Sequence, residues 1–481
     1  MVPPVETDWR AKLLAKVKTS MSAAELSNAS TNAPMSETPV WDSQSIYKVG
    51  DVVRGTGDSS QHRYICVGVS GEPDSNRRGP SGTSLGKQND GYAIWYYHGP
   101  VRPKHSDSVP PTITWGVQSE LLKDMVGYQV NVPTISDPKV AYSGGLLEVD
   151  PNMGNIAVGV FGGNSGQLSN PLITAPASSA MTFWTGSDKI VLGSYNAIYR
   201  NQRFVLEVND RRISDGVVHM EQSGATPTFF NPGGVKIDFT ATPLKGQRKK
   251  IRIWSMDKFG FMAHKIHVES GQAIEVETNP NRWSVAVEGD SMTQGGLGTP
   301  YQPGMDWVSQ VARLVGADSA ANMAQGGTGF ISNAYGAKTT YLERLDRLVK
   351  LKADVYVIAG NHNDQSYTDA QQIEAALTYL KRLRTLQPQS IVIVTGVLPL
   401  KNEDMVSVKR AEQNLKAAFD QWNDGNAYFL PVSTDPAGAW VNGTEEAFYD
   451  WTVSDGHLIQ RGVDHVAGKY AGAIKNILKG L

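Results

Sequence analysis

The residues best suited to chemistry are Gly-Asp-Ser at positions 289–291. The apolar run Val-Ala-Val at 285–287 precedes them, and the polar segment Met-Thr-Gln-Gly at 292–295 follows. A buried strand that ends in this way would present the hydroxyl of Ser291 at the rim of a sheet, where a substrate can reach it. Because a serine hydroxyl is a weak nucleophile, this hypothesis requires a general base and an oxyanion site elsewhere in the chain.

Three later segments contain residues of the required types. Residues 322–329, Asn-Met-Ala-Gln-Gly-Gly-Thr-Gly, form a glycine-dense loop whose backbone N–H groups could point into a cleft. Residues 359–364, Ala-Gly-Asn-His-Asn-Asp, end an apolar run, and residues 454–462, Ser-Asp-Gly-His-Leu-Ile-Gln-Arg-Gly, place a histidine before the last helical stretch. A histidine can accept the serine proton, and backbone or amide N–H groups can stabilise an oxyanion.

The elements that must position these residues alternate along the chain after residue 279. Strand-like runs at 283–287, 355–359 and 391–397 are interspersed with helical stretches near 305–314, 370–386, 407–423 and 466–478. This alternation predicts parallel strands in a three-layer α/β/α domain. Functional residues of such sheets lie at the carboxyl ends of the strands, and the candidate segments all fall at strand or helix boundaries.

The order of these four segments resembles the SGNH (GDSL-type) hydrolase superfamily, over about residues 282–481. The resemblance implies a flavodoxin-like α/β fold and a serine esterase that needs no cofactor and no metal. It implies that Ser291 is the nucleophile and that His457 is the general base. The backbone N–H groups of Ser291 and Gly327 and the side-chain amide of Asn363 would hold the oxyanion.

Departures from the family pattern leave alternatives open. The family usually has an aspartate three residues before the histidine, where this chain has Ser454. Asp455 is the predicted third member of the triad and Asp450 is the alternative, although the family also tolerates a dyad in which a carbonyl orients the histidine. At the oxyanion site the alternatives are Asn361 beside Asn363 and Gly326 beside Gly327.

Residues 110–280 contain short β-type runs broken by Gly, Pro, Asn and Asp, which predicts a β-sandwich of the jelly-roll kind. Arg-Lys-Lys at 248–250 leads into one such run, so we expect a solvated turn there and not a nucleic-acid patch. His264 and His267 lack a nearby carboxylate or thiol cluster, so we expect no metal site. A jelly roll followed by an SGNH domain resembles carbohydrate acetyl esterases, in which the sandwich helps to form the glycan groove.

Residues 40–101 alternate aromatic residues with turn residues, which predicts a small β-module with an aromatic core. The order Trp, Tyr-x-x-Gly-Asp-x-Val, Tyr-x-Cys, Gly-Pro-x-Gly-Thr, Asp-Gly, Trp-x-Tyr resembles small chitin-binding-type carbohydrate modules. Trp41 and Tyr64 are expected in the core, whereas one or two of Trp95, Tyr96 and Tyr97 are candidates to stack on a sugar. The alternative is a module that serves only as a spacer.

The composition excludes several classes of protein. A formal net charge of −2 over 481 residues gives no electrostatic reason to expect a nucleic-acid or membrane partner. The single cysteine, Cys66, permits no intrachain disulfide and is expected to be buried. No apolar run approaches the ~18 residues of a membrane span, and no signal peptide is visible. A short amphipathic helix at 9–26 is expected to pack on protein, with a linker at 27–39.

The chain is thus expected to comprise an arm and linker at 1–39, a β-module at 40–101, a jelly-roll sandwich at 110–280 and a hydrolase domain at 281–481. We expect a serine esterase that removes O-acetyl groups from a polysaccharide through a Ser-His-Asp acyl-enzyme mechanism. It would act outside the cell or on a virion as a phage tail protein, in which case a homotrimer is expected. The alternatives are a lipase or thioesterase, made less attractive by the lack of an apolar lid sequence, and a glycan-binding tail adhesin with a degenerate hydrolase fold.

Overall fold

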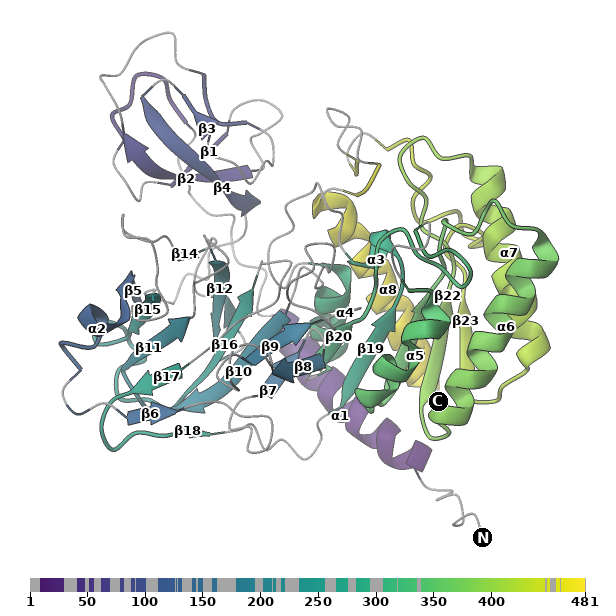
Figure 1. The fold of residues 1–481 in the computed structure, drawn as a ribbon, viewed down its shortest axis with the longest axis horizontal. Helices are drawn as coiled ribbons and strands as arrows, with labels where there is room; N and C mark the ends of the chain where they lie inside the picture. The colour runs from purple at the N-terminus through teal and green to yellow at the C-terminus, as the bar shows by residue number, and fades with distance from the viewer. Residues whose placement is uncertain are drawn as a thin grey trace.

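The computed structural model arranges the chain as a β-module, a middle β-region and a C-terminal α/β domain (Figure 1). It describes residues 9–29, 41–47, 52–55, 62–69, 78–81, 88–90, 92–100, 111–125, 127, 129–131, 141–143, 146–149, 158–161, 179–194, 202–209, 211–212, 218–220, 233–255, 265–275, 283–294, 306–317, 319–334, 339–445, 448–449, 456–458 and 460–480.

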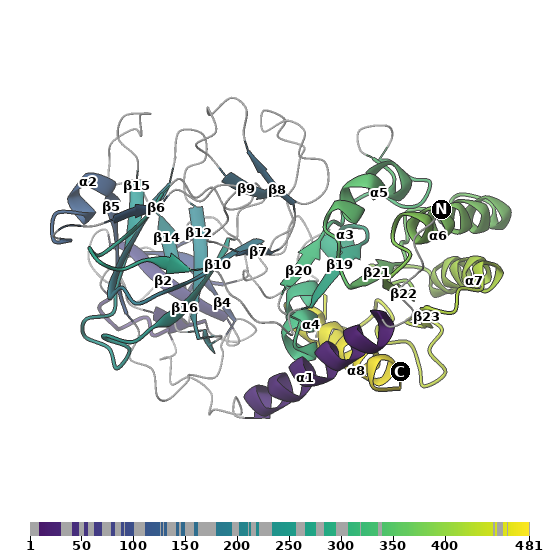
Figure 2. The same ribbon diagram turned by 90° about the horizontal axis from the view of Figure 1, so that it is seen from below.

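A parallel five-stranded sheet forms the centre of the C-terminal domain, in the order β20-β19-β21-β22-β23. Its strands are β19 (Ser284–Glu288), β20 (Ser319–Asn322), β21 (Val355–Ala359), β22 (Ile391–Thr395) and β23 (Ala427–Leu430). One face is covered by α4 (Trp307–Val315) and α8 (Gln460–Gly480), and the other by α5 (Tyr341–Lys350), α6 (Asp369–Leu386) and α7 (Met405–Trp422) (Figures 1 and 2). This arrangement confirms the predicted parallel, three-layer α/β/α domain.

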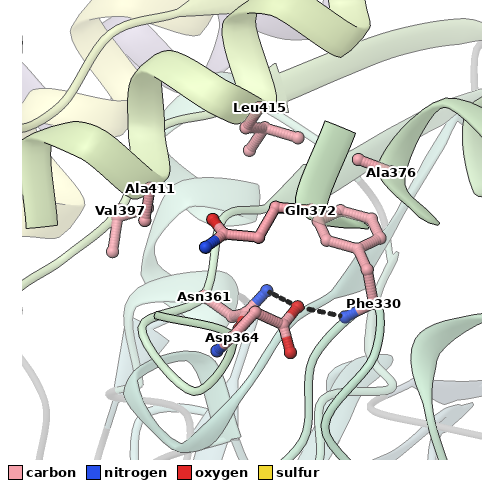
Figure 3. Close-up of a pocket in the computed structure, with 8 residues that line it drawn as sticks. All are labelled: Phe330, Asn361, Asp364, Gln372, Ala376, Val397, Ala411 and Leu415. Atoms are coloured by element: carbon pink, nitrogen blue, oxygen red, sulfur yellow. Dashed lines mark hydrogen bonds between the residues drawn. The ribbon is translucent and has the colours of Figure 1, made fainter. Parts of the chain in front are cut away.

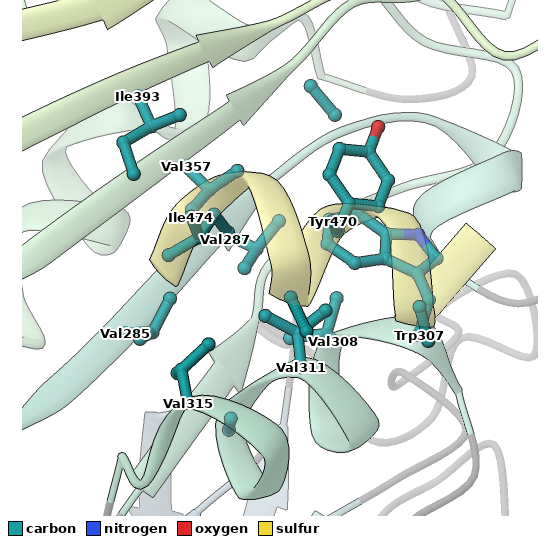
Figure 4. Packing of buried hydrophobic residues seen from close by; sticks show 14 of the residues in the cluster. Val285, Val287, Trp307, Val308, Val311, Val315, Val357, Ile393, Tyr470 and Ile474 are labelled. Atoms are coloured by element: carbon teal, nitrogen blue, oxygen red, sulfur yellow. The ribbon is translucent and has the colours of Figure 1, made fainter. Parts of the chain in front are cut away.

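The strands of this sheet are apolar on both sides because helices cover both faces. Val285 and Val287 of β19 belong to the core under α4 and α8, whereas Ala286 between them belongs to the core under α5, α6 and α7. In the first of these cores the rings of Trp307 and Tyr470 stack with their centroids 4.4 Å apart (Figure 4). Successive side chains of a strand point to opposite faces, so a strand buried on both sides reads as a continuous apolar run.

The first described element, α1 (Trp9–Ala29), packs against α4 and α8 (Figure 2). Leu13, Leu14 and Val17 are buried in the same core as those helices. Arg10 donates a hydrogen bond from Nη2 to the Tyr428 hydroxyl of β23 at 2.8 Å. The helix of the predicted arm therefore packs on protein, as expected, and completes the core of the C-terminal domain.

Two antiparallel sheets lie in the middle of the chain. The first has the order β5 (Thr112–Val117), β15 (Gly233–Asp238), β11 (Lys189–Ser194), β17 (Lys265–Val268) and β6 (Gln129–Asn131). The second has the order β13 (Arg211–Arg212), β12 (Gln202–Val208), β16 (Lys249–Ser255), β10 (Ser179–Thr185) and β18 (Ile274–Glu275), with β14 (Val218–Met220) on β12 and β7 (Ala141–Ser143) on β10. Smaller elements are α2 (Gln118–Leu121) and the pair β8 (Leu146–Val149) and β9 (Val158–Phe161).

Buried side chains from both antiparallel sheets meet in a single apolar core. Ile190 and Ile237 come from the first sheet, and Phe183 and Ile253 from the second. Two sheets that share one core make a β-sandwich. The narrower expectation of a jelly roll stays a prediction.

The basic cluster at 248–250 is not a solvated turn. The Lys249 side chain has no exposed surface, and its Nζ contacts Asp188 Oδ1 at 3.0 Å and the Gln247 carbonyl oxygen at 2.6 Å. Arg248 pairs with Glu275 and lies over the Trp184 ring at 4.3 Å. The expectation of a solvated turn was wrong for Lys249 and Lys250, which are buried in β16, whereas the Arg248 side chain is 54% exposed. An acceptor-lined site within the sandwich satisfies the buried ammonium group of Lys249.

The small β-module is a four-stranded antiparallel sheet in the order β1 (Val52–Arg54), β2 (His62–Val69), β4 (Ala93–Pro100) and β3 (Gln88–Asn89). Its core is aromatic, as predicted: Trp41, Tyr47, Tyr64, Tyr92 and Trp95 are buried together with Cys66. Trp95 has no exposed surface, so the structure places it in this core and not on a sugar-binding face. Tyr96 and Tyr97 lie in β4, and their side chains are outside the described residues.

Asp90 organises the aromatic core, and its replacement by alanine is expected to destabilise the module by about 3 kcal/mol or more. Its Oδ2 accepts hydrogen bonds from the indole N–H groups of Trp41 and Trp95 at 3.1 and 2.8 Å. Its Oδ1 accepts the backbone N–H groups of Tyr92 and Ala93. Without the carboxylate these buried donors lose their partner, which tryptophan fluorescence during chemical unfolding would report.

The matched control for this prediction is Asp42→Ala. Asp42 is exposed and accepts hydrogen bonds in a local turn, from Gln44 and Ser45. Its removal is expected to change the free energy of unfolding by no more than about 0.5–1 kcal/mol. Equal effects of the two variants would contradict the role given to Asp90.

Glu207 connects the sandwich to the C-terminal domain. Its side chain is 2% exposed, and its Oε1 lies 2.8 Å from Arg313 Nη1 of α4. Its Oε2 lies 3.3 Å from Arg252 Nη1 within the sandwich. Both guanidinium groups neutralise one buried carboxylate. The contact between Glu207 and Arg313 therefore holds the sandwich against α4.

Candidate active site

Ser291 lies where β19 meets the short helix α3 (Ser291–Gln294), at the carboxyl edge of the parallel sheet. Its predecessor Asp290 accepts the Met292 backbone N–H at 2.9 Å through Oδ1, and its carbonyl oxygen accepts the Gln294 N–H at 2.8 Å. A side chain at Gly289 would overlap Thr293, so only glycine allows this tight turn. The strand-to-helix turn predicted for the nucleophile is thus present.

A buried ion pair supports the backbone that leads into the Ser291 turn. Glu288 and Arg344 have no exposed side-chain surface, and Arg344 Nη2 lies 2.7 Å from Glu288 Oε1. The same guanidinium group donates to the Gly289 carbonyl oxygen at 3.0 Å and lies 4.7 Å from the Tyr341 ring centroid. Burial raises the pKa of Glu288 to about 7, although Arg344 acts in the opposite direction. The pair therefore ties α5 to the backbone just before Asp290.

The glycine loop after β20 lies directly against the nucleophile. A side chain at Gly326 would meet the Cβ of Ser291 at 3.1 Å, so this loop needs a glycine to approach so closely. The Gly326 N–H is already donated to Gln294 Oε1 at 2.6 Å. Gly327 has a φ of 75° and is partly exposed. The structure therefore favours Gly327 over Gly326 as the backbone donor to an oxyanion.

Asn361 and Asn363 are also distinguished by their contacts. Asn361 is buried and exchanges two hydrogen bonds with Asp364, from Nδ2 to the carboxylate at 3.1 Å and from the Asp364 N–H to Oδ1 at 3.0 Å. Asn363 is partly exposed, and its Nδ2 donates to the Thr328 carbonyl oxygen at 2.9 Å and, at 3.4 Å, to Asp290 Oδ2. Asn363 thus bridges the glycine loop and the nucleophile turn, which favours it over Asn361 as the predicted oxyanion donor.

Asp364 holds the glycine loop in place. Its carboxylate accepts backbone N–H groups from Phe330 and Ser332, each at 2.8 Å, and a longer one from Ile331. Burial raises the pKa of Asp364, while these hydrogen bonds act to lower it. The segments that carry Gly327 and Asn363, the predicted oxyanion donors, are therefore connected through one carboxylate.

Asn363→Ala is expected to lower kcat by about 10²–10³-fold, the usual consequence of removing one oxyanion donor. Asn361→Ala is the matched control, because it removes the same type of side chain two residues earlier, where the amide contacts Asp364 and not Asp290. We expect it to lower the free energy of unfolding by about 1–3 kcal/mol and to affect kcat less. Steady-state kinetics and thermal unfolding of both variants distinguish the roles, and a larger loss of kcat in Asn361→Ala would reverse the assignment.

His457 precedes α8 and lies near the nucleophile turn. Burial raises the pKa of Asp290, whereas the charges of His362 and, to a smaller extent, His457 act to lower it. The neighbouring Gly456 carbonyl oxygen accepts the Lys401 N–H at 2.8 Å, and Leu458 is buried and forms a bridge with Tyr449. These contacts fix the loop that carries the predicted base. Asp455 and Asp450 both lie outside the described residues, so the third triad member stays a prediction.

The structure also brings a second histidine–carboxylate pair to the same edge. His362 Nδ1 lies 3.2 Å from Glu403 Oε1, and His362 Nε2 lies 3.8 Å from Asp290 Oδ2. The sequence predicted neither Glu403 nor Arg344 as part of the site. The only signal for Glu403 was its place after the run at 391–397, because residues following adjacent parallel strands gather at one edge.

A cavity of about 10 Å³ lies behind the Asn361–Asp364 turn, where Gln372 and Leu415 come from α6 and α7 (Figure 3). Its size suits a single water molecule and not a sugar. Ser291 does not line this cavity. The cavity is therefore not the substrate site. The candidate active site is the group of residues around Ser291, where Asn363 contacts Asp290.

The sequence also raised the questions of a metal site and of a membrane-spanning helix. Among the described residues, no group of three or more His, Cys, Asp or Glu side chains is placed to hold a metal ion. His267 lies buried in β17, and His264 is outside the described residues. The described helices include none that is both long and apolar enough to cross a membrane.

Residues 287–464 match the family model of the GDSL-like lipase/acylhydrolase family. The matched segment begins in β19 and ends in α8, so it contains Ser291, the glycine loop, Asn363 and His457. The chain therefore contains a GDSL-like lipase/acylhydrolase domain. No curated protein matches the chain in sequence.

Three solved structures share the fold at low sequence identity. A family two carbohydrate esterase from Cellvibrio japonicus is 12% identical, with a TM-score of 0.50 over 73% of this chain and 99% of that chain. The salicylyl-acyltransferase SsfX3 from a tetracycline biosynthetic pathway is 13% identical, with a TM-score of 0.51 over 73% and 99%. An active-site mutant of a family two carbohydrate esterase from Clostridium thermocellum is 14% identical, with a TM-score of 0.50 over 72% and 100%. The shared fold covers more than residues 283–480 and thus extends into the β-sandwich.

Proposed function

We propose that the protein is a serine esterase that removes O-acetyl groups from a polysaccharide. The observation that carries the proposal is the position of Ser291 at the carboxyl edge, against the glycine loop. Asn363 and His457 both act on the preceding residue, Asp290. The similarity in fold to family two carbohydrate esterases, including the sandwich, supports a carbohydrate ester as the substrate.

In this mechanism His457 accepts the proton of Ser291 while the serine oxygen attacks the acetyl carbonyl. The N–H groups of Ser291 and Gly327 and the amide of Asn363 stabilise the tetrahedral oxyanion. When the intermediate collapses, the sugar oxygen leaves with the proton from His457 and acetyl-Ser291 remains. Water then attacks the acyl-enzyme, again with His457 as base, and acetate is released. Asp455, or Asp450 as the alternative, would orient the imidazole.

Acetate release from a panel of acetylated polysaccharides tests this function directly. Wild type is expected to release acetate from at least one of them and to hydrolyse p-nitrophenyl acetate, and Ser291→Ala to do neither. Faster hydrolysis of long-chain esters or thioesters would favour the lipase or thioesterase alternative. Polysaccharide binding with no hydrolysis of any ester would favour the adhesin.

Acyl transfer to an alcohol is a second candidate, because the fold is equally similar to that of an acyltransferase. The two reactions share the acyl-enzyme and differ only in whether water or a hydroxyl compound attacks it. Product analysis in the presence of a sugar acceptor separates them: a hydrolase yields acetate, whereas a transferase yields the acetylated acceptor.

The proposed setting is outside the cell or on a virion, where an enzyme would meet such polysaccharides. A phage tail protein is the specific form of this proposal, and a homotrimer is then expected. Light scattering coupled to size-exclusion chromatography measures the mass of the assembly. The proposed sugar contacts of the β-module now rest on Tyr96 and Tyr97, since Trp95 is buried.

A further inference from the structure

Asp290, His362 and Glu403 form a connected group at the edge of the sheet that carries Ser291. Asp290 follows β19, His362 follows β21, and Glu403 lies between β22 and α7. These strands are neighbours in the sheet, so their carboxyl ends bring the side chains together. The side chains are 2%, 13% and 14% exposed, respectively, and are therefore largely withdrawn from water.

Glu403 fixes the orientation of the His362 ring. Its Oε1 faces His362 Nδ1 at 3.2 Å and accepts a hydrogen bond from Gln365 Nε2 at 2.8 Å. Its Oε2 accepts the Leu400 backbone N–H at 2.7 Å. Since an ionised carboxylate can only accept hydrogen bonds, His362 must carry a proton on Nδ1.

The other ring nitrogen of His362 faces Asp290. Nε2 lies 3.8 Å from Asp290 Oδ2 and makes no hydrogen bond in the described structure. The backbone N–H of His362 donates to the same carboxylate oxygen at 3.3 Å. With Nδ1 protonated, a neutral ring would point a lone pair at this oxygen, whereas a doubly protonated ring is attracted to both carboxylates.

The surrounding charges favour the doubly protonated form. Burial acts to lower the pKa of His362, but Glu403, Asp290 and Asp364 act in the opposite direction, and the net result is a raised pKa. His457 also acts on the Asp290 carboxylate. The His362 ring thus lies between two carboxylates, in a position that favours its second proton, beside the residue that precedes the nucleophile.

A protonated His362 would offset the negative charge of Asp290 near the oxyanion site. Asp290 Oδ2 also attracts the Asn363 amide, at 3.4 Å, and an unneutralised carboxylate there would repel a developing oxyanion. We propose that His362, protonated and held between Asp290 and Glu403, is a positioning residue that neutralises Asp290 and leaves the Asn363 amide available to the oxyanion. This inference rests on the proposed esterase function.

The proposal predicts how the rate depends on pH. His457 must be neutral to accept the serine proton. Protonation of this base at acid pH therefore lowers kcat/KM. The raised pKa of His362 means that its charge is present below that pKa and is lost as pH rises through it. We therefore expect kcat/KM for p-nitrophenyl acetate to fall again at alkaline pH.

Two variants test this assignment. Glu403→Gln removes the negative charge that stabilises the cation, so the alkaline fall of kcat/KM should move to lower pH. His362→Gln keeps a hydrogen-bond donor but cannot titrate, so the alkaline fall should disappear and the maximal rate should drop about tenfold, less than for a direct oxyanion donor. Glu445→Gln is the matched control, because Glu445 also accepts a backbone N–H, from Asn442, in an exposed loop.

A measurement independent of turnover decides the protonation itself. In protein labelled with ¹⁵N-histidine, the imidazole signals that are missing in His362→Gln identify His362. We expect them to titrate above the ordinary histidine range in wild type and at lower pH in Glu403→Gln. Titration below that range, or an alkaline fall that Glu403→Gln does not move, would overturn the proposal. Wild type that hydrolyses no ester would refute the proposed function, while the titration would still show whether His362 is the cation inferred here.

Discussion

Ser291→Ala is expected to lower kcat for p-nitrophenyl acetate by roughly 10⁴–10⁶-fold, because the acyl-enzyme can no longer form. The residue lies at the first position of α3 with the glycine loop against its side chain. Residual turnover would come from the oxyanion donors and from substrate binding alone. Steady-state kinetics, with active-site titration of wild type by an organophosphate, measures the effect.

Ser284→Ala is the matched control for this variant. Ser284 begins the same strand β19, at the opposite end from Ser291, and its hydroxyl contacts Asp354 at 3.3 Å. Its removal is expected to leave kcat within about twofold and to cost no more than about 1 kcal/mol of stability. If Ser291→Ala kept more than a few per cent of wild-type kcat while remaining folded, the acyl-enzyme mechanism would be wrong.

His457→Ala is expected to have a similar effect, roughly 10⁴–10⁶-fold on kcat, because the serine proton then has no acceptor. His465→Ala is its matched control in the same domain. His465 Nε2 lies 3.1 Å from the Trp440 carbonyl oxygen and its ring stacks on Phe448, so it packs α8 against the preceding segment. We expect that variant to melt at a lower temperature and to keep kcat within about threefold once folded.

Asp455→Asn and Asp450→Asn extend the same experiment to the third triad member. The true partner of the imidazole is expected to lose about 10⁴-fold in kcat, because the amide favours the wrong tautomer. The other variant should stay near wild type. Small losses in both would show that His457 is oriented by a carbonyl, as in a dyad.

Much of the C-terminal domain could be predicted because its signals are local. Continuous apolar runs at 285–287, 355–359 and 391–395 are what a sheet covered on both faces requires, and all became parallel strands. The rule that functional residues follow such strands then placed Ser291 and Asn363 at one edge. These predictions needed no knowledge of long-range contacts.

The same local reasoning failed where burial depends on distant partners. Lys249 reads as a surface charge, yet Asp188 and backbone carbonyl groups enclose it within the sandwich. Trp95 reads as a sugar-stacking ring, yet Asp90 and Tyr47 hold it in the core of the module. Composition and periodicity cannot reveal which of several aromatic residues faces inward when strands are short and a bulge shifts their register.

By itself the sequence determined the strand-to-helix turn at Ser291, the parallel sheet and the order of the segments around the site. These follow from residue type and period along a single stretch of chain. The tertiary structure favours Gly327 over Gly326, because the Gly326 N–H is already donated to Gln294. It favours Asn363 over Asn361, because Asn363 contacts both the glycine loop and the Asp290 carboxylate. It also brought together two pairs that are far apart in the chain. The pairing of parallel strands side by side brings Glu403 to His362, and the packing of α5 on the sheet brings Arg344 to Glu288.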